Sequence, residues 1–288
     1  MGLVRACKAF ARLETYRGSE NELRVFYECL DEHLADVVVA AVHLLKPLTG
    51  VQNNYIEALA LAAALHDVGK ALHNIFYRSL VERILAKELE GRLSFRYHEI
   101  MSAAILGAYY WDLGGLEQET ASIALRAIAM HHQGLRGVSA HVYSEGLAQL
   151  SSMYSRLPES YREDLHEMIS DVIEGVANRL SENNQMKSVV SALKNIANAV
   201  SSLELRLDTA LDEASTLFPT WIKVRKELAT RSRIITGLLM LADSAVARAK
   251  APYGSSEASK YSAEALWLYR AYVSHQLQRS KQSRAHKF

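Results

Sequence analysis

Apolar residues recur along most of the chain at intervals of three and four positions, the spacing that places them on one face of an α-helix. Only four prolines interrupt the chain, and long segments rich in alanine, leucine, glutamate and arginine favour helix. No run of alternating apolar and polar residues is convincing enough to predict strands. The sequence therefore predicts an all-α protein with helices over residues 21–45, 53–68, 72–90, 97–111, 117–132, 159–180, 186–215, 220–228, 231–249 and 256–280.

The stretch from about 145 to 230 differs from the segments on either side of it. It is richer in serine, asparagine, glutamate and arginine, and its predicted helices are amphipathic instead of apolar on all sides. We interpret it as a helical insertion in a main domain that spans residues 1–250. Residues 251–288 are predicted to form a C-terminal helix and a basic tail, which is either solvated or in contact with phosphate.

A His-Asp pair at the end of an apolar run is the first candidate for chemistry. Residues 59–65 are apolar, and His-Asp-Val-Gly-Lys follows at residues 66–70. Both His66 and Asp67 can reach metal ions beside the end of a helix, where a carboxylate can bridge two cations while an imidazole binds one. A lone His-Asp pair is more often structural than a ligand set, so the interpretation needs support from elsewhere in the chain.

Four further histidines lie in segments that are predicted to be buried. His33 lies on the apolar face of its helix, His98 begins another helix, and His131 and His132 end the apolar run 123–130. Burying an imidazole without a partner costs desolvation free energy. Any one of these histidines could be an ordinary hydrogen-bonded core residue, but five such positions beside an aspartate favour a metal site.

Asp243 is the last candidate ligand. It shares a helical face with Leu239 and Val246, so its carboxylate is predicted to point inward, where it needs a cation or strong donors. A salt bridge to Arg126 is the structural alternative. His73 lies one turn past the motif and could line a cleft. The remaining histidines are predicted to be ordinary solvated residues: His43, His141, His166, His275 and His286.

Composition and charge limit the class of protein. Lysine plus arginine (33) nearly equals aspartate plus glutamate (32), so contact with nucleic acid would need a local basic patch. The only cysteines, Cys7 and Cys29, are typical of a reducing compartment and argue against a disulfide framework. No signal peptide, membrane span or P-loop is recognisable, so we expect a soluble, cytoplasmic protein without a P-loop motor.

The candidate residues resemble the pattern of the HD-domain metallohydrolases, which is a histidine, a His-Asp pair and a distant aspartate. His33, His66-Asp67 and Asp243 match that pattern. With the extra histidines the chain is similar, over about residues 25–250, to the HD nuclease of type I CRISPR interference in its stand-alone form without a helicase. The resemblance implies an HD-domain helical bundle with additional inserted helices.

The resemblance also implies ligands for two metal ions, with Asp67 as the bridge. The first ion would be held by His33, His66, Asp67 and Asp243, and the second by Asp67, His98, His131 and His132. Lys70 is implied to steady the scissile phosphate or a hydroxide, with a plain helix-terminal lysine as the alternative. Imidazole and carboxylate ligands suit Mn, Fe, Co or Ni better than Ca, and Mg is accepted less readily.

The implied reaction is hydrolysis of a phosphodiester, with Asp67 and Lys70 as catalytic residues and single-stranded DNA as the expected substrate. RNA is a further possibility, and a recessed site admits one backbone more easily than a duplex. One alternative is a nucleotide or cyclic-nucleotide phosphohydrolase of the same superfamily, and another is a helical binding subunit in which metal only stabilises the fold. The missing motor, taken with the resemblance, implies a separate helicase subunit and an RNA-guided surveillance complex as partners.

Overall fold

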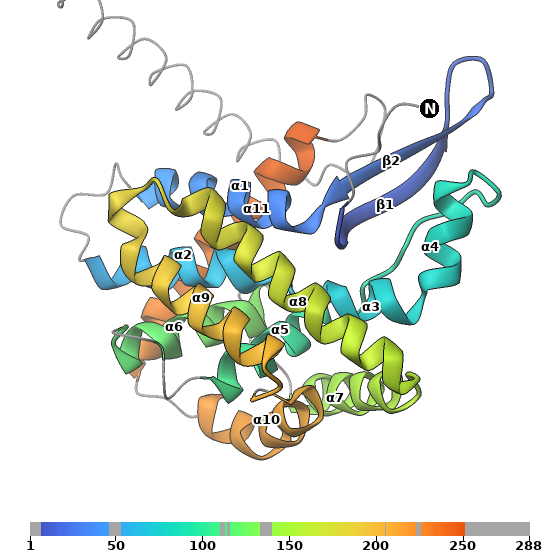
Figure 1. The fold of residues 1–288 in the computed structure, drawn as a ribbon. Helices are drawn as coiled ribbons and strands as arrows, with labels where there is room; N and C mark the ends of the chain where they lie inside the picture. Colours follow the sequence, from blue (N-terminus) through green and yellow to red (C-terminus); the bar gives the residue numbers. More distant parts are fainter. Residues whose placement is uncertain are drawn as a thin grey trace, which may run out of the picture.

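The body of the protein is a bundle of α-helices with one β-hairpin attached, as Figure 1 shows. The computed structural model describes residues 7–45, 53–109, 113, 116–132, 140–204, 206–222 and 226–250. The all-α prediction is confirmed for the body of the protein, and the hairpin is an addition to it. In chain order the elements are β1 (Phe10–Arg17), β2 (Leu23–Cys29), α1 (Leu30–Leu45), α2 (Asn53–Leu65), α3 (Lys70–Phe76), α4 (Arg78–Leu85), α5 (His98–Ala108), α6 (Gln118–Met130), α7 (Ala140–Ser155), α8 (Glu159–Leu180), the 3-10 helix η2 (Asn184–Met186), α9 (Lys187–Ser201), α10 (Leu207–Ile222) and α11 (Lys226–Lys250).

The hairpin corrects the prediction that a helix begins near residue 21. Strands β1 and β2 pair in antiparallel register, with Leu13 opposite Tyr27, and Asn21 adopts the left-handed conformation in the turn between them. Residues 21–29 have apolar positions that suit either a helix or a strand, an ambiguity that is usual for short apolar runs. In β1, residues 11, 13 and 15 are buried while 12 and 14 are less so, which is the alternation of a strand. Pairing with β1 therefore makes residues 23–29 a strand.

The two cysteines form a disulfide, so the expectation that they do not pair is wrong. Cys7 and Cys29 are bonded, with their Cα atoms 5.2 Å apart. The hairpin causes the pairing, because it brings the segment before β1 beside the end of β2, where the Leu30 amide donates to the Ala9 carbonyl at 2.9 Å. A separation of 22 positions in the chain hides this proximity from sequence reasoning.

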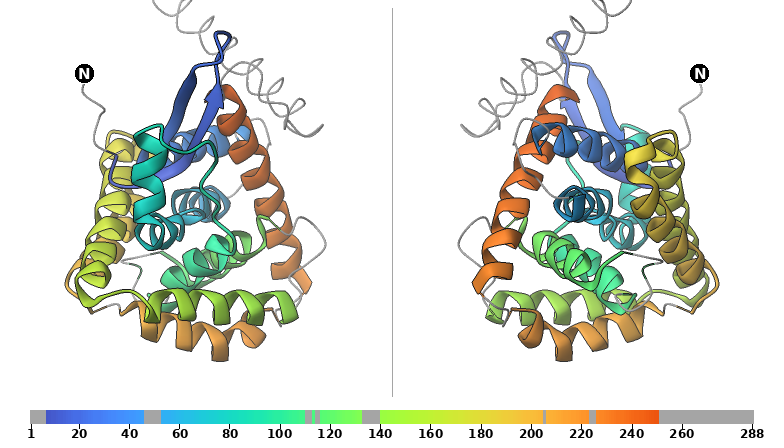
Figure 2. Two further views of the ribbon diagram at one scale, coloured as in Figure 1. Left: turned by 90° about the vertical axis from the view of Figure 1, so that its right-hand side faces the viewer. Right: turned by 90° about the vertical axis from the view of Figure 1, so that its left-hand side faces the viewer.

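The core surrounds α2, which is buried on all sides over residues 58–65. A helix that is apolar all round belongs in the interior. Helix α2 packs against α1, α6, α9 and α11. Figure 2 shows α8 and α9 on one side of this helix and α11 on the other, with α7 and α10 below. The C-terminal end of α2 therefore lies deep in the molecule, where residues from several helices can reach it.

Several predicted helix boundaries differ from those observed. The predicted helix 72–90 is divided at Tyr77 into α3 and α4, and 186–215 is divided by a turn in which Leu203 adopts a positive φ. A single bent residue leaves the apolar spacing on both sides intact, so the pattern cannot reveal it. The predicted helix 256–280 and the basic tail lie outside the described residues.

Helix α7 was not predicted, because glycine and several serines make its sequence a weak helix former. Packing explains why it forms. Tyr143, Leu147 and Leu150 are buried, and a Cβ on Gly146 would lie 2.3 Å from Cδ1 of Ile100, so the glycine lets α7 approach α5 closely.

The predicted insertion, residues 145–230, contains α8, η2, α9 and α10 together with parts of α7 and α11. Buried side chains of α8 and α9 belong to the same hydrophobic cluster as those of α1 and α2, so the core is continuous across this range. The division into a main domain with an insertion stays a prediction. Within the described part of the chain, no helix has the length and apolar character needed to cross a membrane.

Candidate metal centre

Seven side chains from five segments converge beside the C-terminal end of α2. His66 and Asp67 occupy the turn between α2 and α3. The others come from α1, α5, the end of α6 and α11: His33, His98, His131, His132 and Asp243. They form two groups that share Asp67, and within each group the potential ligand atoms lie within 4.8 Å of one another. All seven residues that the sequence singled out as ligands are thus brought together, while their role as ligands stays a prediction.

The first group contains His33, His66, Asp67 and Asp243. The Nε2 atom of His33 lies 3.1 Å from Oδ1 of Asp243 and 3.4 Å from Oδ2 of Asp67. His66 Nε2 lies 3.4 Å from the same Asp67 oxygen and 3.8 Å from Asp243 Oδ1. Two imidazole nitrogens and two carboxylate oxygens therefore face a common centre. Imidazole partners account for the charge of Asp243 without the arginine that was considered as its alternative.

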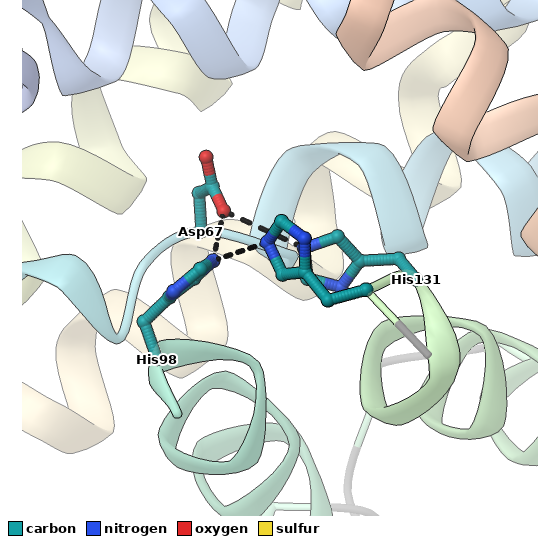
Figure 3. A group of neighbouring side chains, drawn as sticks. Asp67, His98 and His131 are labelled. Carbon is teal, nitrogen blue, oxygen red and sulfur yellow. Dashed lines mark hydrogen bonds and ion pairs between the residues drawn. The ribbon is translucent and has the colours of Figure 1, made fainter. Parts of the chain in front are cut away.

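The second group contains Asp67, His98, His131 and His132. Figure 3 shows the Asp67 carboxylate directed at the rings of His98 and His131. Asp67 Oδ1 lies 2.7 Å from Nε2 of His98 and 3.6 Å from Nε2 of His131, while Nε2 of His132 lies 3.0 Å from Nε2 of His98. Asp67 thus presents Oδ2 to the first group and Oδ1 to the second, which is the arrangement that a bridging carboxylate requires.

Hydrogen bonds on the far side of several of the rings turn Nε2 toward the centre. The Nδ1–H groups of His66 and His131 donate to the carbonyl oxygens of Ala63 and Ile128, at 2.9 and 2.7 Å. His98 donates in the same way to a carbonyl of the loop before α5. Because a carbonyl oxygen can only accept, the proton lies on Nδ1 and Nε2 keeps its lone pair for a cation.

Unsatisfied polar atoms show that these residues fit a metal site. Nε2 of His33, His66 and His131 and Oδ1 of Asp67 are buried without a hydrogen-bond partner. Leaving such atoms unpaired in an interior is costly, and buried charges normally pair or bind metal. A donor set of imidazole nitrogens and carboxylate oxygens, without thiolate, suits divalent ions of the first transition row.

The electrostatics of the cluster favour ionised carboxylates. Burial alone would favour the protonated acid, but the neighbouring His66 imidazole, the ammonium group of Lys70 and the His98 imidazole hold the pKa of Asp67 well below its usual value. The pKa of Asp243 is also lowered well below its usual value, against the effect of burial, because the imidazoles of His33 and His66 lie beside its carboxylate. Two permanent negative charges at the centre of five imidazoles provide the field that attracts cations.

Lys70, the first residue of α3, contacts the bridging carboxylate directly. Its Nζ donates to Oδ2 of Asp67 at 2.6 Å and to the Ala11 carbonyl at 3.2 Å, and it lies 5.2 Å from the centre of the Phe95 ring. Its side chain is 14% exposed, so it is neither free in solvent nor fully enclosed. A plain helix-terminal lysine would not need these partners, and the predicted contact with phosphate remains a proposal.

The histidines outside the cluster are less uniform than predicted. His141 is exposed, His43 is partly buried, and His275 and His286 lie outside the described residues. The prediction of a solvated residue is wrong for His166, which is buried between α8 and α9 and donates from Nδ1 to the Val200 carbonyl at 3.2 Å. His166 lies on the inward face of the amphipathic helix α8. Its polar sequence neighbours gave no indication that it is buried.

His73 belongs to neither group of ligands, although it is buried close to them. Its ring lies against Phe95, and its Nε2–H donates to the Arg96 carbonyl at 2.9 Å, which ties α3 to the loop that leads into α5. Burial, together with the nearby charge of His98, lowers the pKa of His73 to about 4.

His73 is expected to make metal-free protein less stable in acid. Its pKa is about 4 in the folded state and about 6.5 in the unfolded chain, so only the unfolded chain takes up this proton between those values. Stability is therefore lost as pH falls from about 6.5 to about 4, by about 3 kcal/mol from this residue. Urea unfolding across this range should show a weaker pH dependence for His73→Gln, which keeps a donor for Arg96. Identical pH dependence in both proteins would contradict the assignment.

Sequence reasoning missed Glu28, whose carboxylate is buried and accepts the Nδ1–H of His33 at 3.0 Å. The signal was present in the sequence, because Glu28 is the only acidic residue in the otherwise apolar and aromatic run from Val25 to Leu30. It becomes informative only when that run is known to be a strand.

Comparison with known proteins adds one finding. The family described as Cas3, HD domain, matches residues 17–244, a range that covers most of the chain and contains all seven converging residues. No curated protein and no solved structure matches the chain. The chain therefore belongs to the Cas3 HD-domain family, the metal-dependent HD-type nucleases of CRISPR systems.

Proposed function

We propose that the protein cuts single-stranded DNA by hydrolysis of its phosphodiester bonds at the site around Asp67. The observation that carries this proposal is the position of that carboxylate, which presents one oxygen to each of two groups of potential ligand atoms. Two divalent ions at adjoining sites are a recurrent device for phosphodiester hydrolysis. The family supplies the reaction class, and the geometry supports the arrangement of two ions.

The ligand sets follow the two groups. His33, His66, Asp67 and Asp243 would hold one ion, and Asp67, His98, His131 and His132 the other. The nitrogen-rich donor set favours Mn, Fe, Co or Ni, with Mg accepted less readily. When bound, such ions would supply activation of water and neutralisation of phosphate charge.

The protein's own groups prepare the site for a phosphodiester. Hydrogen bonds to Nδ1 hold the imidazoles of His66 and His131 with Nε2 aimed at the centre, so little reorganisation is needed on binding. Lys70 is held against Asp67 with part of its side chain accessible. We propose that its ammonium group also contacts a phosphate oxygen, which places it beside the scissile bond.

Access to the cluster supports a single strand as the substrate. His33 and His66 are buried, whereas His132 is exposed and the side chain of Asp243 is 23% exposed. A backbone would therefore approach from the side of His132 and Asp243. A recessed site that is reached from one edge admits one strand more easily than a duplex.

The proposal includes partners and a location. An opened strand must be supplied, and we propose a separate helicase subunit and an RNA-guided surveillance complex for that role. We also propose a cytoplasmic location. Cysteine scarcity no longer supports it, because Cys7 and Cys29 are bonded, so it rests on the family's nucleic-acid substrate.

A cleavage assay tests the proposal. Protein loaded with Mn²⁺ or Ni²⁺ should cut an end-labelled single-stranded DNA oligonucleotide, leave the matching duplex intact, and lose activity on addition of a chelator. RNA, mononucleotides and cyclic nucleotides are tested as substrates in the same assay. His98→Ala should lose activity, while His141→Ala, which changes an exposed histidine of α7, should keep it. Turnover of mononucleotides or cyclic nucleotides without oligonucleotide cleavage would contradict the nuclease proposal and support the alternative, a small-molecule phosphohydrolase.

A further inference from the structure

We propose that Glu28 is a positioning residue that holds the His33 ring with its proton on Nδ1 and its Nε2 directed at the first group of ligands. This inference rests on the proposed function, because it takes that group to be a metal site. Glu28 lies on strand β2 and belongs to neither group of ligands. It would make the hairpin a working part of the metal centre.

The contact itself is short and buried. Nδ1 of His33 lies 3.0 Å from Oε1 of Glu28, and the two side chains are 3% and 4% exposed. A carboxylate can only accept, so the shared proton belongs to Nδ1. On the opposite side of the ring, Nε2 faces Asp243 and Asp67. A carboxylate that accepts from the outer nitrogen of a metal-binding histidine orients the ring and makes it a better ligand.

The position of His33 explains why a side chain is needed here. His66 and His131 lie just past the ends of α2 and α6, where carbonyls of the last helical turn can accept from Nδ1. His33 instead lies in the first turn of α1, where the preceding carbonyls are engaged in the helix that follows. The acceptor must therefore come from another element, and the adjoining strand provides it.

A second contact keeps the Glu28 carboxylate ionised and in place. Nζ of Lys250, at the end of α11, lies 2.9 Å from Oε1 of Glu28 and 2.6 Å from Oδ2 of Asp36. A buried carboxylate needs such a counter-ion to stay charged. Lys250 lies on α11 and contacts Asp36 on α1 and Glu28 on β2. It therefore joins the three elements that carry Asp243, His33 and Glu28.

The hairpin that carries Glu28 is anchored to the rest of the site through its other strand, β1. The Asn74 side chain on α3 accepts from the Phe10 amide at 3.0 Å and donates to the Phe10 carbonyl at 3.1 Å. Lys70 donates to the carbonyl of Ala11 on the same strand. With β1 fixed to α3 in this way, β2 presents Glu28 to His33 from a defined place.

Metal titrations of the full chain test the inference. Metal-stripped protein is titrated with Mn²⁺ by calorimetry, and bound metal is counted by elemental analysis. Glu28→Leu removes the acceptor and should weaken one of the two ions by about 10–100-fold while leaving the other unchanged. Glu28→Gln keeps an uncharged acceptor and should weaken the same ion by a smaller factor. Glu22→Gln, which changes a half-buried carboxylate in the turn of the same hairpin, is the matched control and should bind both ions normally.

A spectroscopic signature separates positioning from a general effect on the fold. In protein loaded with diamagnetic Zn²⁺ and labelled with ¹⁵N-histidine, the wild type should show a hydrogen-bonded Nδ1–H signal that His33→Ala lacks. Glu28→Leu should lose or shift that signal, and Glu28→Gln should retain it. A residue that only stabilised the fold would lower the melting temperature without moving this signal or distinguishing the two ions.

The outcomes for Glu28 and for the nuclease can be told apart. The role of Glu28 would be overturned if Glu28→Gln and Glu28→Leu bound each ion as tightly as the wild type does. It would also be overturned if both ions lost affinity equally, even if the wild type cuts DNA. Should Glu28→Leu fail to fold, an unchanged affinity in Glu28→Gln would overturn it. Loss confined to one ion, in a protein that cuts no oligonucleotide, would sustain Glu28 and refute the nuclease.

Discussion

Replacing Asp67 by alanine is expected to abolish cleavage and to remove both ions at once. The substitution takes one ligand oxygen from each group, because Oδ2 faces His33 and His66 while Oδ1 faces His98 and His131. We expect the cleavage rate to fall by at least about 10³-fold, equivalent to about 4 kcal/mol of transition-state stabilisation. Single-turnover cleavage of single-stranded DNA and the number of Mn²⁺ ions bound per chain are the two measurements.

The control for this variant is Asp164→Ala, which changes an exposed aspartate of α8 that pairs with Arg78. It should cut at the normal rate and bind the normal number of ions. Near-normal cleavage by Asp67→Ala with metal still bound would show that the site is misassigned.

The second large effect is expected from Gly69→Ala, through crowding of a backbone contact. The φ of Gly69 is −60°, so its conformation is open to any residue. Space is the constraint, because a Cβ would lie 2.2 Å from the carbonyl oxygen of His98 and 2.7 Å from Cβ of Met101. The Gly69 amide also donates to Oγ of Ser102 at 2.8 Å, so the first turn of α5 packs directly on the turn that carries His66 and Asp67.

An alanine at this position must push α5 away and carry His98 with it. We expect a loss of about 1–3 kcal/mol in unfolding free energy, typical of overpacking. Cleavage should fall by about 10²-fold, because a ligand displaced by an ångström costs that much. Urea unfolding, Mn²⁺ titration and the cleavage assay measure these effects, and the ion bound through His98 should be the one that weakens.

Gly237→Ala is the matched control for this variant. Gly237 lies within α11, and apart from the adjacent backbone of that helix no atom of the described residues lies within 4 Å of the Cβ that alanine would add. Alanine in an open helical position should raise stability by about 0.5–1 kcal/mol and leave cleavage unchanged. If Gly69→Ala behaved in the same way, the close approach of α5 would not be needed for the site.

The candidate ligands could be predicted because each is anomalous in its own segment. His33 interrupts the apolar face of α1, and Asp67 follows a helix that is apolar on all sides. Asp243 lies among the apolar residues of α11. A polar side chain where packing demands an apolar one needs a partner, and this requirement can be recognised without coordinates.

Prediction failed where contacts between segments determine the local structure. The hairpin and the Cys7–Cys29 bond depend on pairing between neighbouring segments of the chain, and helix α7 depends on packing against the distant helix α5. Their own sequences are ambiguous or weak, so propensity alone could not select the observed conformation.

The sequence by itself determined the helical class, the positions of seven candidate ligands and the family, since these follow from periodicity and from residue types that are conspicuous where they occur. Only the tertiary structure decided that Asp67 faces both groups, that Lys70 rests on Asp67, and that Glu28 reaches His33 from a strand. These relations depend on orientation across segments separated by a few to many positions, and orientation is set by packing, which no local pattern records.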